Sequence, residues 1–357
     1  MSEKRIEDID ENFQTAEIGG KKLKFRKAQE KPFAMSGFAW YGKEHKFCRL
    51  PEAILPQTND GVKSLAWYTS GGMLRFRTDS PVIAIKAKLL HKNTMKHMPN
   101  SGSAGFDLYL GTGENKKFVK MSAPEVGSDS IEELLVDNLP KYIREWTINF
   151  PLYNGIKELS IGLAPECALE KPRQFAIEKP LLFYGSSITQ GGCASRPGNA
   201  YFHMIARKLD ANLINLGFSG SGRGEPAIAE AIASLELSAF IMDYDHNAPT
   251  IEHLIATHEK FFRIIRKKRP SLPVIFVSRC DYDRNFSESE ERIAVIKQTY
   301  LNALSEGDKN VYFINGKILF GRKDRDACTV DGCHPNDIGF YRMAKHIWPV
   351  VKKALSS

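Results

Sequence analysis

The sequence predicts two structural units: a β-sandwich or jelly roll in residues 1–175, then a three-layer α/β/α unit with a parallel sheet in residues 176–357. Three observations support this division. The chain has 357 residues, enough for two domains of ordinary size. Short runs of alternating apolar and polar residues dominate up to about residue 175, which is typical of antiparallel strands. From about residue 180, short apolar strands alternate with helical stretches, which indicates a parallel sheet covered on both faces.

The first half is expected to consist mainly of strands. Turn residues, such as Gly71-Gly72 and Asn154-Gly155, separate its alternating runs. Residues 130–136 are the best candidate for a helix in this half. Residues 165–180, with prolines at both ends and one between, are the expected linker. Clear strand patterns occur at residues 74–77, 83–89 and 157–163.

The second half is expected to fold as alternating strands and helices. Pro226 occupies a first helical turn, where proline is tolerated. Thr250 is a good N-cap for a helix that Pro270 ends. The expected strands are residues 181–184, 213–216, 239–243, 273–277 and 311–314. The expected helices are residues 199–209, 226–235, 250–269, 288–305 and a last one after Asn336.

Composition excludes several classes of protein. Hydrophobic residues make up 42% and charged residues 26%, as in an ordinary globular chain. The net charge of +8 is spread along the chain, and the densest basic cluster, residues 263–269, falls at a predicted helix end, so no nucleic-acid partner is expected. No apolar run approaches the ~20 residues of a membrane helix. The charged N-terminus and six scattered cysteines favour a cytoplasmic location with reduced thiols and no membrane partner.

Four polar segments follow predicted strands, where ligands bind in parallel α/β folds. Ser187 comes two residues after Gly185 and can either expose its hydroxyl or belong to a helix-capping turn. The glycine-rich residues 215–224 can cradle a phosphate or aim a backbone N–H at a reacting oxygen. Residues 243–249 are a turn or part of a site. In residues 331–336 an aspartate precedes a histidine by three positions, so its carboxylate can hold the imidazole Nδ1–H and leave Nε2 as a base.

Together these segments resemble the SGNH, or GDSL-type, hydrolases. The four blocks of that family occur in order between about residues 180 and 350: a Gly-x-Ser block, a glycine block, an asparagine block and a C-terminal Asp-x-x-His-Pro block. Residues 105–109, Gly-Phe-Asp-Leu-Tyr, resemble the Gly-x-Asp-Leu-Tyr element of a two-domain subgroup whose β-sandwich precedes the hydrolase domain. Residues 190–198 also look typical of that subgroup.

The resemblance implies a role for five residues. Ser187 would be the nucleophile, His334 the base and Asp331 the carboxylate that orients it. The N–H groups of Ser187 and Gly220, together with the side-chain amide of Asn247, would form the oxyanion hole. Two blocks depart from the usual pattern, since a serine replaces the aspartate of Gly-Asp-Ser and residues 245–248 read Asp-His-Asn-Ala instead of Gly-x-Asn-Asp.

The function implied is a serine esterase that removes short acyl groups, above all acetyl, from a small molecule, sugar or oligosaccharide, without metal or other cofactor. Three alternatives stay open. The same acyl-enzyme could serve an acyltransferase, the substrate could be a lipid or another ester, or the protein could bind carbohydrate with an inactive hydrolase domain. Nothing in the sequence suggests a lid for long acyl chains.

Two competing site assignments and one loop need a structural answer. Asp243 and His246 form a second Asp-x-x-His, so His246 is an alternative base. Zinc binding by Cys328, Cys333 and His334 is disfavoured, because a fourth ligand such as Cys193 would have to come from far away in sequence. Residues 91–99 are expected to reach from the first half into the hydrolase cleft.

Overall fold

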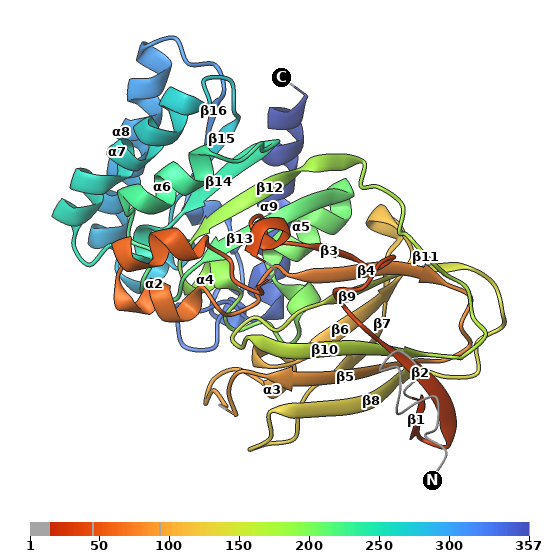
Figure 1. The fold of residues 1–357 in the computed structure, drawn as a ribbon. Helices are drawn as coiled ribbons and strands as arrows, with labels where there is room; N and C mark the ends of the chain where they lie inside the picture. The colour runs from red at the N-terminus through yellow and green to blue at the C-terminus, as the bar shows by residue number, and fades with distance from the viewer. Residues whose placement is uncertain (1–14, 45, 93, 357) are drawn as a thin grey trace, which may run out of the picture.

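The computed structural model describes residues 15–44, 46–92 and 94–356, which form two antiparallel sheets followed by one parallel sheet (Figure 1). The first antiparallel sheet has the order β1-β2-β10-β5-β8, and the second β11-β4-β9-β6-β7 with β3 paired to β4. The strands of the first sheet are β1 (Thr15–Ile18), β2 (Lys21–Lys27), β10 (Ile156–Leu163), β5 (Ile83–Leu89) and β8 (Ser130–Val136). Those of the second are β11 (Leu169–Glu170), β4 (Met73–Thr78), β9 (Arg144–Asn149), β6 (Phe106–Leu110), β7 (Lys117–Ser122) and β3 (Ala34–Ser36).

The two antiparallel sheets pack their apolar faces against each other. Alternate residues Leu74 and Phe76 of β4 and Ile83 and Ile85 of β5 are fully buried in one shared core. Because side chains alternate across a strand, the residues between them face outward or toward other elements. The predicted β-sandwich and its strands at residues 74–77, 83–89 and 157–163 are therefore confirmed.

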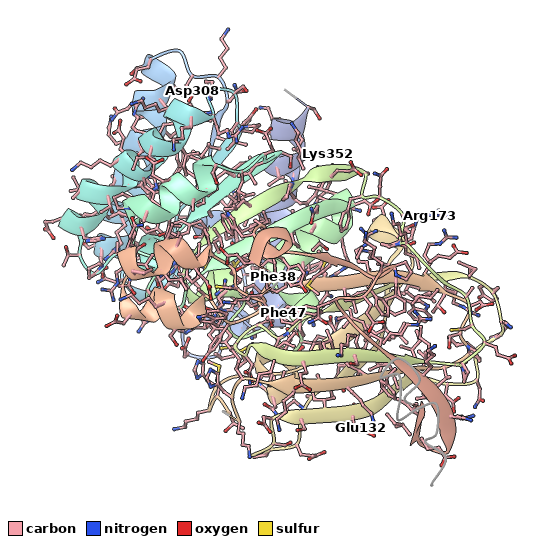
Figure 2. The ribbon with its side chains drawn as sticks, viewed as in Figure 1. Phe38, Phe47, Glu132, Arg173, Asp308 and Lys352 are labelled. Atoms are coloured by element: carbon pink, nitrogen blue, oxygen red, sulfur yellow. The ribbon has the colours of Figure 1, made fainter. Side chains whose placement is uncertain are left out.

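The predicted helix at residues 130–136 is wrong, because this segment is the strand β8. Its buried residues Ile131 and Leu135 are four positions apart, a spacing that places both on one face of either a helix or a strand. Pairing with β5 decides between the two. The register sets Glu132, labelled in Figure 2, opposite Lys86, with an ion pair of 3.3 Å between them.

The parallel sheet has the order β13-β12-β14-β15-β16 and carries helices on both faces, as the sequence predicts (Figure 1). In β12, Leu181 and Phe183 point into a core with α5 and α9, whereas Leu182 and Tyr184 point into a core with α6 and α7. The strands are β12 (Ile177–Gly185), β13 (Ala211–Gly217), β14 (Ala239–Asp243), β15 (Val274–Val277) and β16 (Val311–Ile314). The helices are α4 (Ser187–Gln190), α5 (Tyr201–Leu209), α6 (Pro226–Ala233), α7 (Ile251–Lys268), α8 (Phe286–Ser305) and α9 (Asp337–Leu355).

Part of the first half packs against the parallel sheet. Trp40, Leu50 and Val62 are buried in the same core as α6 and α7. The neighbouring Phe38 and Phe47, labelled in Figure 2, lie in the sandwich core instead, with ring centroids 5.8 Å apart. The connection between β3 and β4 therefore joins the two cores. It contains the helices α1 (Tyr41–Glu44) and α2 (Asp60–Leu65), and α3 (Asn100–Ser103) follows β5.

Within the described residues, no helix is both long enough and apolar enough to cross a lipid bilayer. All six cysteines are described, and each has a free thiol.

Candidate active site

The strands β12, β13 and β14 end side by side, at Gly185, Gly217 and Asp243. The polar segments that follow them therefore meet at one edge of the sheet. Two of these ends have no room for a side chain. A Cβ on Gly185 would lie 2.1 Å from the carbonyl oxygen of Asp243, and one on Gly217 would lie 2.2 Å from the backbone nitrogen of Gln190.

The structure brings together Ser187, His334 and Asp331. Ser187 is the first residue of α4, and the Ser186 hydroxyl caps this short helix by accepting from the backbone N–H of Ile188. Ser187 Oγ lies 2.9 Å from His334 Nε2, and His334 Nδ1 lies 2.7 Å from Asp331 Oδ2. Because a carboxylate only accepts, Nδ1 carries the proton and Nε2 is left to accept from the serine hydroxyl.

The Asp331 carboxylate is held in its charged form. Partial burial opposes ionisation, but hydrogen bonds from the His334 backbone N–H (2.7 Å), the imidazole and the Cys333 backbone N–H (2.9 Å) outweigh it and lower the pKa of Asp331 to about 2. The side chains of Asp331 and His334 are 40% and 26% exposed. The Asp331 carboxylate is therefore ionised at neutral pH, and the relay is open to water on one side.

The glycine loop that follows β13 carries Gly220 in a left-handed conformation, with φ of +64°. Among the described residues, the backbone N–H groups of Gly220 and Ser187 have no hydrogen-bond partner. The loop is anchored at its start, since Phe218 N donates to Gly185 O and Ser219 N donates to the Gln190 side chain, each at 2.9 Å. Two free N–H donors on anchored segments are what an oxyanion hole requires.

Arg49 also anchors the glycine loop, although no motif or periodic pattern in the sequence marks it as part of a functional site. This fully buried side chain donates to Gly217 O (2.7 Å), to Leu65 O (2.8 Å) and to Asn215, and its guanidinium lies 4.6 Å from the Phe218 ring centroid. Burial lowers the pKa of Arg49 to about 9, so it remains a cation at neutral pH. Its guanidinium therefore places a positive charge in contact with the glycine loop.

Asn247 lies beside the glycine loop, but both hydrogens of its amide are engaged. Nδ2 donates to Phe218 O at 2.8 Å and to Gly222 O at 3.0 Å. It can donate to a substrate oxygen only by giving up one of these bonds, since the amide has two hydrogens. Direct donation by Asn247 to an oxyanion stays a prediction, and the bonds present hold the loop.

His246, the alternative base, is engaged elsewhere. Its Nε2 lies 2.8 Å from Asp281 Oδ1, and its side chain is 7% exposed. Ser187 is bonded to His334 instead. The zinc set considered from the sequence does not assemble either, because no ligand cluster in the described ranges contains Cys328.

Two features of the sandwich reach this site. The exposed His97, in the loop after β5, has its ring centroid 5.8 Å from that of His334, as expected for residues 91–99. Asp107, in the Gly-x-Asp-Leu-Tyr element, is buried and accepts from Arg196 (2.9 Å) and from the backbone of Gly198 (2.8 Å). This element therefore ties the sandwich to the segment that follows the nucleophile block.

A parallel α/β sheet with a Ser–His–Asp relay at the carboxyl ends of its strands is an arrangement that can carry out acyl transfer. Comparison with known families agrees. Residues 178–352 match the GDSL-like lipase/acylhydrolase family, and residues 23–169 match the N-terminus of SGNH-hydrolase-type esterases, the GxDLY family. The chain belongs to the GDSL-like lipase/acylhydrolase family and is by class a carboxylic ester hydrolase.

Solved structures share this fold over most of the chain. A GDSL-like lipase from Bacteroides ovatus is 31% identical, with a TM-score of 0.85 over 94% of this chain and 98% of that one. The salicylyl-acyltransferase SsfX3 from a tetracycline biosynthetic pathway is 20% identical, with a TM-score of 0.76 over 91% and 95%. A family two carbohydrate esterase from Clostridium thermocellum, in complex with cellohexaose, is 13% identical, with a TM-score of 0.60 over 80% and 93%. The last two share the fold.

Curated relatives match a smaller part of the chain. The 3-dehydroquinate dehydratase of Escherichia coli O7:K1 is 28% identical over 159 residues, which is 43% of this chain. The match spans 61% of the length of that relative.

Proposed function

We propose that the protein hydrolyses short acyl esters, above all acetyl esters, of a sugar or oligosaccharide through an acyl-enzyme on Ser187. The continuous relay from Ser187 through His334 to Asp331, with contacts of 2.9 Å and 2.7 Å, is the observation that carries the proposal. A serine hydroxyl is a weak nucleophile until a base removes its proton, and this geometry supplies that base.

In the first half of the reaction, Ser187 Oγ attacks the ester carbonyl carbon while its proton passes to His334 Nε2. The oxyanion accepts from the N–H groups of Ser187 and Gly220. When the intermediate collapses, the carbon–oxygen bond of the ester breaks and Nε2 gives its proton to the leaving alcohol. Asp331 stabilises the imidazolium without taking the proton.

In the second half, water attacks the acyl-enzyme and gives a proton to His334 Nε2. The bond between the acyl carbon and Ser187 Oγ then breaks, and Oγ takes the proton back. The products are a carboxylic acid and the free enzyme. The exposure of His334 and Asp331 supports hydrolysis over transfer to another alcohol, because water reaches the relay directly.

A polar side chain from the sandwich lies beside the relay, which supports a sugar as the alcohol. His97 is exposed beside His334, and its ring nitrogens can bond to hydroxyl groups. The shared fold with a carbohydrate esterase solved with cellohexaose agrees with this assignment. We propose no dehydratase activity, because the assembled residues are those of acyl transfer.

Hydrolysis of 4-nitrophenyl acetate tests the nucleophile. We expect Ser187→Ala to lose at least ~1000-fold in kcat/KM. Ser186→Ala is the matched control, since it removes the neighbouring hydroxyl and weakens only a helix cap. Equal rates in wild type and Ser187→Ala would contradict the proposal.

A substrate panel tests the alcohol and the acyl group. Acetylated sugars should be better substrates than acetylated aliphatic alcohols, and His97→Ala should raise KM for the sugars while leaving 4-nitrophenyl acetate unaffected. A series from acetate to decanoate should favour acetate. Faster turnover of long acyl chains would point to a lipase instead.

A further inference from the structure

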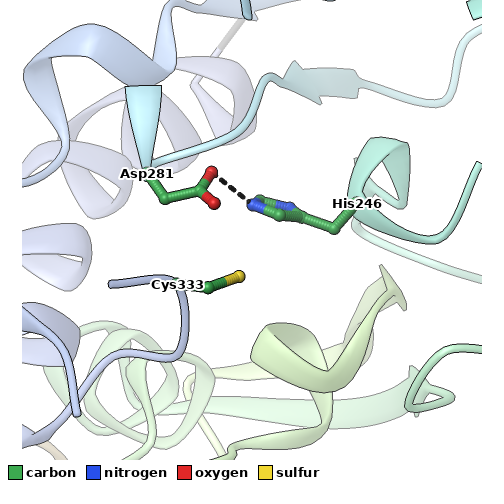
Figure 3. A group of neighbouring side chains, drawn as sticks. All are labelled: His246, Asp281 and Cys333. Carbon is green, nitrogen blue, oxygen red and sulfur yellow. Dashed lines mark hydrogen bonds and ion pairs between the residues drawn. The ribbon is translucent and has the colours of Figure 1, made fainter. Parts of the chain in front are cut away.

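The side chains of His246, Asp281 and Cys333, which carry metal-binding atoms, lie close together (Figure 3). His246 comes from the 3-10 turn Asp245–Asn247 after β14, Asp281 from the loop after β15, and Cys333 from the loop before α9. Their ligand atoms all lie within 4.8 Å of one another. Because the three segments are far apart in sequence, only the fold assembles this cluster.

The cluster contains a buried carboxylate oxygen that the chain itself satisfies poorly. The Asp281 side chain is fully buried, and its Oδ1 lies 2.8 Å from His246 Nε2. Within the described ranges, its other oxygen, Oδ2, has no nitrogen or oxygen donor, and the Cys333 thiol is the group that the chain turns toward this carboxylate. Because a thiol is only a weak donor, the buried carboxylate is poorly satisfied by the chain itself, and a cation between it and the sulfur would satisfy both groups.

We propose that His246, Asp281 and Cys333 bind one Zn²⁺ ion. Imidazole nitrogen, carboxylate oxygen and thiolate sulfur are the donors that zinc takes in proteins. With zinc–ligand bonds of ~2.0–2.3 Å, the ligand atoms of a tetrahedral site lie about 3.3–3.8 Å apart. The observed cluster reaches this spacing by small side-chain movements, chiefly by separating His246 Nε2 from Asp281 Oδ1.

The surroundings suit such an ion. Asp245 Oδ1 lies 3.2 Å from His246 Nδ1, the position from which a second carboxylate orients a zinc-binding histidine. One thiolate and the Asp281 carboxylate balance the two charges of zinc, while Arg279, at 3.1 Å from Asp281 Oδ1, balances Asp245. The site is therefore neutral with zinc bound.

A surface cavity adjoins the cluster. Asp281 and Gly332, the residue before Cys333, both line it, together with Thr329, so an ion entering from this side has only a short distance to cross. Water from this cavity can fill the fourth position. None of the three ligands is a member of the Ser187 relay, so the ion would fix the Cys333–His334 segment to the end of β15 and leave the relay free.

Metal binding to the full-length protein tests the site directly. After treatment with a chelator and dialysis, the wild type should bind one Zn²⁺ per chain in calorimetry, and its Tm should rise by a few degrees. Co²⁺ should give a thiolate-to-cobalt charge-transfer absorption. Cys333→Ser should abolish this absorption and weaken Zn²⁺ binding at least ~100-fold, since even residues outside the ligand shell change metal affinity ~10–100-fold.

Two further variants serve as a control outside the cluster and as a second ligand substitution. Cys167→Ser, a partly exposed cysteine outside the cluster, should behave as the wild type. Asp281→Asn should also weaken binding, and it covers the case in which Cys333→Ser does not fold. Absence of Zn²⁺ binding in the wild type, or full affinity in both Cys333→Ser and Asp281→Asn, would overturn the proposal. So would inhibition of ester hydrolysis in step with Zn²⁺ binding, because it would assign the metal to His334.

Discussion

Asn247 offers a prediction whose magnitude follows from its contacts. Its amide supplies hydrogen bonds to two carbonyl oxygens of the glycine loop, Phe218 O and Gly222 O, in a place where the side chain is 7% exposed. Asn247→Ala leaves Gly222 O without its donor, whereas Phe218 O keeps its bonds from the backbone N–H groups of Ser221 (2.9 Å) and Gly222 (3.1 Å). At ~1–3 kcal/mol for one buried group left unsatisfied, the free energy of unfolding should fall by about 1–3 kcal/mol. In a domain of this size each kcal/mol corresponds to a Tm lower by about 2–4 °C.

The same variant should lower kcat, because the loop carries the Gly220 N–H. Loss of one oxyanion donor costs ~100–1000-fold in kcat, with little change in KM. We expect both effects together, measured by differential scanning fluorimetry and by hydrolysis of 4-nitrophenyl acetate. Asn247→Asp is the matched control of equal size. It should lower Tm further than Asn247→Ala, since its carboxylate would face the two carbonyl oxygens.

The result that refutes this reasoning is specific. If Asn247→Ala loses 100-fold in kcat while its Tm stays within about 1 °C of wild type, the two loop bonds contribute nothing to stability. The amide would then act on the oxyanion directly, as the family resemblance implies.

Three other predictions concern the same edge of the sheet. Asp331→Asn should lower kcat by ~100–1000-fold between pH 5 and pH 9. This is less than the ~10,000-fold typical of a buried triad aspartate, because the Asp331 side chain is 40% exposed. A decrease in kcat below threefold would exclude the relay. Gly217→Ala should lower Tm by more than 10 °C or prevent folding, since its Cβ would lie 2.2 Å from Gln190 N. In Gly220→Ala the new Cβ meets no atom within 4 Å, so this variant should stay folded despite the positive φ. Equal Tm values for the two variants would contradict this reasoning. Burial raises the pKa of Asp243 to about 8, so the folded chain keeps a proton that the unfolded chain releases above about pH 4. Tm should therefore fall as pH rises from 4 to 8 in the wild type, and by less in Asp243→Asn; an equal fall in both would contradict this.

Local patterns were sufficient for most elements. Residues 239–243 were expected as a strand and form β14, and Thr250 and Asn336 cap α7 and α9. Period-two alternation identified β4, β5 and β10. The other strands of the sandwich were not identified one by one, and residues 130–136 were predicted wrongly because their apolar spacing fits a helix and a strand equally, so that the pairing with β5 decides.

The site residues fall into two groups: those that a local motif brings together and those that only the fold brings together. Asp331 and His334 are three residues apart, and a local turn is enough to bring the carboxylate to the imidazole. The partnership of His334 with Ser187 spans 147 positions and could be expected only from family resemblance. The family resemblance already favoured His334 over His246, and the structure places His334 beside Ser187 and His246 beside Asp281.

The sequence by itself indicated a β-sandwich followed by an α/β/α unit and the alternating strands and helices of the second half, because these depend on periodicity. The motifs in their recognisable order also indicated Ser187, His334 and Asp331 as the candidate relay. The tertiary structure alone decided that Arg49 lies beneath the glycine loop, that both amide hydrogens of Asn247 bind that loop, and that Cys333 faces Asp281. These contacts join residues far apart along the chain. Their partners are selected by three-dimensional packing and by the need to satisfy buried polar groups, neither of which leaves a periodic signal in the sequence.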